Sequence, residues 1–203
     1  MAILNKQKSI VIGSILLAGA SSIAVAETVN TTATVTVQNA FNLTEVTPLN
    51  LGTLRATADP AGTETATVVI PADGSAPTAA TSGPPAALSV LTAGTPATYT
   101  VDSAAGFTSL TLTLPGPTTT ITVAAAAAPP GTPAFTLGTF TGYITSGPNS
   151  GTAYTTATPN LQTDATGTVS FSVGATLTTD ATTTTSPYID GDYTGTFPVI
   201  VVY

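Results

Sequence analysis

The chain closes on Tyr193-Thr-Gly-Thr-Phe-Pro-Val-Ile-Val-Val-Tyr203. Side chains of an extended strand alternate between its two faces, so one face here collects the large side chains at odd positions. These are Tyr193, Phe197, Val199, Val201 and Tyr203. Such a face needs a second layer, and we expect the cover to come from an earlier part of the chain or from another chain. Pro198 cannot donate a backbone hydrogen bond, so the ladder is expected to lapse there, as at an edge or a bulge.

The composition predicts an all-β fold. Of 203 residues, only 6% are charged, and the chain holds 18 Gly and 16 Pro but no Cys, His or Trp. Threonine and alanine dominate, so the larger Val, Leu, Ile, Phe and Tyr residues mark the core. They occur in short alternating runs separated by Gly, Pro and Asp, which is typical of strands joined by turns. The length suits one domain of moderate size.

The first 26 residues have the features of a cleaved secretory signal. Lys6 and Lys8 precede an apolar run from Ile10 to Ala20, and Ala24-Val-Ala26 offers a small-x-small cleavage site. The apolar run is shorter than the roughly 20 residues that span a membrane as a helix. We therefore expect an exported chain of residues 27–203, forming a single domain with no membrane span after cleavage, secreted or held at the cell surface or in the periplasm of a Gram-negative-like bacterium.

Charge and residue types exclude several function classes. After cleavage Arg55 is the only basic side chain against ten acidic ones, so the chain is expected to repel nucleic acid. Without His, Cys or a mature Lys, the usual nucleophile and base sets cannot be assembled, and we expect a non-enzyme with no cofactor. Asp180, Asp190 and Asp192 form the densest acidic group and are a weak candidate for calcium, although a solvated turn is the simpler interpretation.

Alternation predicts about eight to ten strands, and the absence of a convincing helix predicts a β-sandwich with long Pro/Gly/Thr-rich loops. The first is a long, half-buried strand from Thr32 to Leu43. Later ones are expected at 64–70, 88–91, 97–101, 107–114, 119–123, 134–140, 168–177 and 193–203, with a hairpin turn at 102–106 and a bulge at Gly174. Residues 71–96 and 142–166 are expected to be surface loops, the second exposing Tyr143 and Tyr154.

Three short motifs carry a family resemblance. They are Leu49-Asn-Leu-Gly52, Val173-Gly-Ala-Thr-Leu177 and Gly191-Asp-Tyr-Thr-Gly-Thr-Phe-Pro-Val-Ile-Val-Val-Tyr203. Together they resemble domain of unknown function 4402, a family of secreted bacterial proteins. The resemblance implies export and an immunoglobulin-like β-sandwich, and it implies no chemistry.

Both ends of the mature chain are also similar to pilin subunits of the chaperone-usher type, including the spore-coat-protein-U-like group. In those subunits an alternating N-terminal segment leaves its own domain and fills a groove beside the final strand of the next subunit. The resemblance implies that residues 27–43 contain such a donor strand. Its inward side chains would be Val29, Ala33, Val35, Val37, Phe41 and Leu43.

Two functions follow as expectations. The first is a structural subunit of a fimbria-like filament or surface layer, of the kind that supports adhesion and biofilm, which self-associates by strand addition or binds other surface proteins. The second is a monomeric envelope or secreted binding module, in which the N-terminal strand pairs within its own domain and the loops contact glycans or a surface.

Overall fold

A computed structural model describes residues 27–35, 40–116, 121–125, 129–182 and 186–203. Contacts divide the chain into an N-terminal unit, residues 1–37, and a second unit, residues 38–203. The described part of the second unit is all-β, as predicted, and its sheets are antiparallel throughout. The described residues include no helix that could cross a membrane. The predicted signal, residues 1–26, lies outside the described residues.

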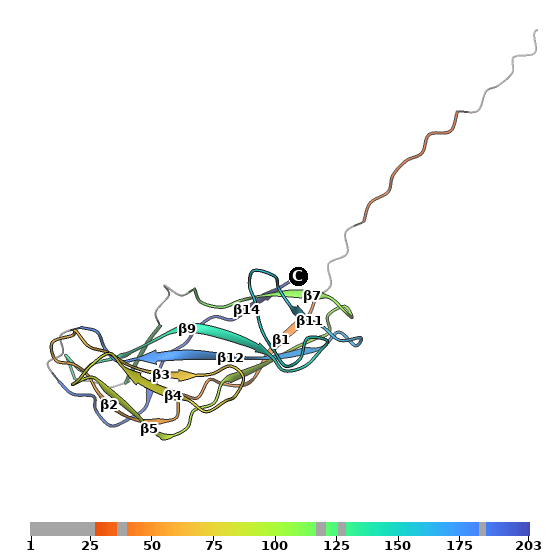
Figure 1. Cartoon of the computed structure of the whole chain (residues 1–203). Coiled ribbons are helices and arrows are strands. Elements are labelled where there is room, and N and C mark those ends of the chain that lie inside the picture. Colours follow the sequence, from red (N-terminus) through yellow and green to blue (C-terminus); the bar gives the residue numbers. More distant parts are fainter. Residues whose placement is uncertain (1–26, 36–39, 117–120, 126–128, 183–185) are drawn as a thin grey trace, which may run out of the picture. The chain divides into compact units, whose positions relative to one another are not determined.

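Two long neighbouring strands organise the second unit (Figure 1). They are β9 (Phe135–Ile144) and β12 (Val169–Thr178), each of ten residues. On its other edge β12 pairs first with β6 (Ala97–Asp102) and then with β3 (Ala66–Ile70). The main path of this sheet runs β1-β6-β12-β9-β8-β13, where β1 is Asn42–Thr47, β8 is Ile121–Ala125 and β13 is Tyr193–Thr194. β4 (Thr78–Thr81) extends it beyond β3, and β10 (Thr152–Ala153) pairs with β9.

Smaller sheets supply the rest. One has the order β11-β7-β14, formed by Leu161–Gln162, Ser109–Thr113 and Ile200–Val202. The other pairs β2 (Thr53–Thr57) with β5 (Ala87–Thr92). Two apolar clusters form the core, consistent with a β-sandwich. The first joins β6, β9 and β12 to β7, β11 and β14, and the second joins β3, β9 and β12 to β5.

Period-two alternation accounts for the buried faces. Val169, Phe171 and Val173 on β12 are buried in the first cluster, as predicted, and so are Tyr99 and Val101 on β6. The predicted bulge is confirmed, because the β12–β9 register shifts between Gly174 and Thr176. A Cβ atom at Gly174 would overlap the carbonyl oxygen of Ile70, so the absence of a side chain lets β3 approach β12.

Several sequence predictions need correction. The residues between β6 and β7 do not form a hairpin turn, because these strands belong to different sheets. The short strand predicted at 88–91 is confirmed as β5, but residues 71–96 also contain β4, and residues 142–166 contain β10 and β11. The described residues form fourteen strands, several of only two or three residues, where eight to ten were predicted.

The closing stretch is not one strand. Tyr193–Thr194 pairs with β8, Ile200–Val202 pairs with β7, and residues 195–199 between them have no strand pairing. Pro198 lies in this interval, where the ladder was expected to lapse. The predicted alternation survives the break. Phe197, Val199 and Val201 pack on the core, whereas Thr196, Pro198 and Ile200 are exposed.

Candidate functional site

The open edge of β14 is the candidate site. Within the described residues β14 has β7 as its only neighbour, with Val201 opposite Leu112, so its other edge carries backbone groups free to pair. The side chains of Ile200 and Val202 on its outer face are 49% and 47% exposed. Natural sheets protect such edges with charges, prolines, bulges, short strands or cover. β14 has three residues and follows Pro198 by two positions, but it carries no charged residue.

β14 belongs to the first core cluster. The side chains of Val101, Leu110 and Phe171, on β6, β7 and β12, are fully buried, and Val201 on β14 itself is 8% exposed. The apolar residues packed around this cluster are only partly buried, and they include Phe41, Leu43, Phe197 and Val199.

An aromatic contact joins the residue before β1 to the residue after β14. The rings of Phe41 and Tyr203 meet edge to face with centroids 5.2 Å apart. Tyr203 was predicted to be a core residue, but it is among the exposed large side chains. The chain therefore enters the second unit, just before β1, beside the residue that follows β14. Sequence periodicity could not reveal this pairing, because the two rings are at opposite ends of the chain.

The predicted donor segment differs from the strand expected in it. Residues 27–35 form no strand, and Val29 and Val35 are 83% and 86% exposed. The prediction of a half-buried strand starting at Thr32 is therefore wrong for residues 32–35, and the first strand begins at Asn42. Ala33 is also exposed, and Val37 lies outside the described residues. Phe41 and Leu43 do pack on the first core cluster.

A second aromatic group lies where β13 meets β8. Phe135 stacks on Tyr188 at 4.3 Å between centroids, and Tyr193 packs edge-on against Phe135 at 5.1 Å. The Tyr188 hydroxyl accepts a hydrogen bond from the Asp180 amide, and burial raises the pKa of Tyr188 to about 12. The hydroxyl of Tyr193 bonds to the backbone of Ile189. These tyrosines are partly buried packing residues, which matches the core role predicted for Tyr193.

The structure does not bring the calcium candidates together. No group of three or more acidic, His or Cys side chains that could hold a metal occurs in the described ranges. Asp180 instead caps its own turn, with Oδ1 accepting from the amide and hydroxyl of Thr182 and Oδ2 from the Ala134 amide. Asp190 and Asp192 are exposed on either side of Gly191. The solvated-turn interpretation fits this arrangement.

Tyr154 is not the free loop residue that the sequence predicted. Its hydroxyl accepts a 2.9 Å hydrogen bond from the Leu112 amide on β7, and its ring packs on the first core cluster. This hydrogen bond connects the segment after β10 to β7, the strand that pairs with β14. Tyr143 lies on β9 opposite Ser172 and is partly buried. Neither residue presents a free aromatic face in a mobile loop.

The acidic residue with the most hydrogen bonds is Asp59, which the sequence did not single out. Its carboxylate is buried and accepts bonds from the Ala61, Thr63 and Glu64 amides and from the Thr63 hydroxyl. These bonds, led by that of the Thr63 hydroxyl, lower the pKa of Asp59 from 3.8 to about 2. Asp59 therefore fixes the turn before β3.

The charged form of Asp59 is favoured in the folded state, so its contribution to stability is complete above pH 3.8. It is lost as the pH falls toward 2. We expect Asp59→Asn to lower the melting temperature at pH 6, measured by circular dichroism. Between pH 4 and 2, the melting temperature of the variant should depend less on pH than that of the natural chain. If the melting temperatures of the natural chain and the variant change equally with pH over that interval, this role of Asp59 is contradicted.

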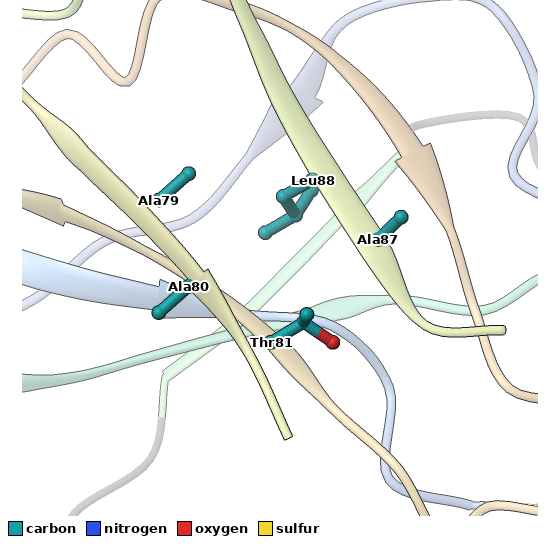
Figure 2. Close-up of a pocket in the computed structure, with 5 residues that line it drawn as sticks. All are labelled: Ala79, Ala80, Thr81, Ala87 and Leu88. Carbon is teal, nitrogen blue, oxygen red and sulfur yellow. The ribbon is translucent and has the colours of Figure 1, made fainter. Parts of the chain in front are cut away.

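A depression of about 150 Å³ separates β4 from β5. Figure 2 shows Leu88 reaching from β5 into the space beside β4. Its lining consists of Ala79, Ala80, Thr81, Ala87 and Leu88. With one hydroxyl and otherwise alkyl groups, this lining offers no acid, base or metal ligand.

Comparison with known proteins places the chain in a family. No curated protein and no solved structure matches it. A family model described as "Domain of unknown function (DUF4402)" matches residues 41–203, which begins one residue before β1 and includes every strand. The chain therefore belongs to the DUF4402 family.

Proposed function

We propose that this protein is an exported structural subunit that joins copies of itself by β-strand addition. The N-terminal segment of one copy, residues 27–37, pairs with the free edge of β14 in the next. The observation that carries this proposal is the unpaired and uncharged edge of β14 beside the partly buried side chains of Phe197 and Val199. The product would be an extracellular filament or surface layer on a bacterial cell.

The strand order supports this proposal. An immunoglobulin constant-type sandwich has strands A-B-E-D in one sheet and C-F-G in the other. In chain order β1, β6, β7, β9, β12 and β14 take the places of A to F, because β1-β6-β12-β9 gives A-B-E-D and β7-β14 gives C-F. In the described part of the chain, no strand takes the place of G beside β14. An added strand in that place would cover Phe197 and Val199.

The N-terminal segment has suitable chemistry for that place. Between Glu27 and Glu45 the chain carries no charge, and Val29, Ala33, Val35 and Val37 fall on one face when it is extended. Strand addition obtains affinity from backbone hydrogen bonds and register from alternate side chains in pockets. The exposed valines gain most from this cover, since burying a valine side chain contributes roughly 1.5 kcal/mol or more.

The first edge of the large sheet is a poorer acceptor. β1 carries Glu45 and a register irregularity between Glu45 and Thr47. Charges and bulges on an edge strand disfavour further pairing. Of these two edges, β14 is the better acceptor. A non-enzymatic role agrees with the lack of His and Cys in the sequence.

Peptide binding tests the proposal. A mature chain lacking residues 27–37 should fold, because the described part of that segment belongs to no strand, and it should stay monomeric. A labelled peptide of residues 27–37 should bind it in fluorescence anisotropy, and a scrambled peptide should not. Loss of folding on deletion, or equal binding of both peptides, would refute strand addition.

A further inference from the structure

Phe107 has two unusual properties. Its side chain is 62% exposed, and its backbone has φ of +55°. This left-handed conformation is costly for a bulky residue. An exposed phenylalanine ordinarily gains nothing for its own domain that would offset this cost. The chain therefore holds a large apolar side chain in solvent, in a strained conformation.

The surrounding loop fixes Phe107 firmly. The Phe107 amide donates to the Asp164 carbonyl at 3.0 Å, and its carbonyl accepts from the Gln162 side-chain amide at 3.0 Å. Next to it, the Thr108 amide donates to the buried Thr163 hydroxyl. A Cβ atom at Gly106 would lie 2.7 Å from the Ala165 carbonyl oxygen, so the two loops are in close contact. The position of Phe107 is thus set by the fold.

Phe107 lies at the end of the second unit where β1 begins. Asn42, the first residue of β1, pairs with Asp102, the last residue of β6, and the loop that carries Phe107 follows directly. In the second sheet β14 ends opposite Thr111, near the start of β7. Phe41 and Tyr203 meet at this same end.

Chain length determines how near a neighbouring copy must be. Val37 and Phe41 are four residues apart, and a fully extended chain of that length spans at most about 15 Å. A copy that holds Val37 beside its β14 must therefore reach within about 15 Å of Phe41, whatever path the linker takes. The surface that it faces is the end of the domain formed by Phe41, Tyr203 and the Phe107 loop.

We propose that Phe107 is a contact between neighbouring copies of this chain, packing on the copy that receives the N-terminal segment. This inference rests on the proposed function. Strand addition alone holds two copies together at one place, and a second contact fixes the angle between them. The strain at Phe107 is retained because its side chain serves the assembly rather than its own domain.

The test replaces Phe107 without strain. Asn adopts the left-handed conformation readily, so Phe107→Asn in the mature chain, residues 27–203, should melt at the same or a higher temperature. Self-association, measured by sedimentation velocity over a concentration series, should weaken about tenfold to a hundredfold. Leu91→Asn is the matched control, because Leu91 is equally exposed at 62% but lies on β5, and its association should match that of the natural chain.

A second measurement separates this inference from strand addition. The labelled 27–37 peptide should bind a full mature chain carrying Val35→Asp and Val37→Asp with the same affinity whether or not Phe107→Asn is present. If the peptide binds and Phe107→Asn associates like the natural chain, the Phe107 contact is overturned and strand addition stands. If the peptide does not bind and the natural chain does not associate, the proposed function fails, and this inference fails with it.

Discussion

A mature chain carrying Val35→Asp and Val37→Asp is expected to remain monomeric under conditions in which the natural chain polymerises. In an added strand both side chains would lie beside Phe197 and Val199, apolar side chains that give a carboxylate no partner. Burying an unpaired charge costs several kcal/mol, so association should weaken more than about a thousandfold. Sedimentation velocity and negative-stain microscopy would show the loss of polymers.

The control for this variant places the same charges on the other face of the donor segment. Thr34→Asp with Thr36→Asp alters the residues that would point to solvent in an added strand, and we expect polymers to persist with modestly lower affinity. Val35 is exposed and outside any strand, so neither double variant should change the melting temperature of the monomer by more than a few degrees. Equal loss of assembly in both variants would show that the added charge is responsible, whichever face of the segment carries it.

Local alternation predicted which side chains face the core, because period two is a property of the strand itself. It correctly separated Val199 and Val201 from Ile200 and Val202. It did not predict that the closing stretch changes partner between β13 and β14, since the choice of neighbouring strand depends on residues far along the chain. The division at Pro198 leaves a short β14 with an open edge, where one continuous strand was expected.

The predicted loops concealed strands for a different reason. β4 reads Thr-Ala-Ala-Thr and pairs with β3, but it carries no large side chain to mark an inward face. The pairing of Asn50 with Thr95 requires close backbone approach, since a Cβ atom on Gly94 would overlap the Asn50 carbonyl oxygen. In the sequence, Gly94 appears only as a turn signal.

The candidate site was predictable in part. The sequence pointed to both ends of the mature chain, and the structure adds the unpaired edge of β14 and the Phe41–Tyr203 contact. Phe107 was not singled out, because it was placed only as the first residue of an expected strand at 107–114. The structure places it before β7, with a backbone that no strand adopts.

A chain with a second copy of residues 27–37 appended after Tyr203 through Asn-Gly is expected to complete its own sandwich. A two-residue Asn-Gly turn favours a hairpin, so the appended strand would run antiparallel to β14 and cover Phe197 and Val199. A short tether gives an effective concentration near the millimolar range. For a segment that binds with a micromolar dissociation constant, the free energy of unfolding should rise by about 4 kcal/mol, and the melting temperature by roughly 8–16 °C.

The same chain should not polymerise, because every β14 edge is already occupied by the appended strand. The matched control appends the segment with Asp at the positions of Val35 and Val37, which leaves the tether unchanged. It should melt like the natural chain and still assemble through its unaltered N-terminal segment. If the unaltered appended segment does not raise the melting temperature, and the chain that carries it still forms polymers, then β14 is not the acceptor edge. The joint between copies would then have to involve another strand.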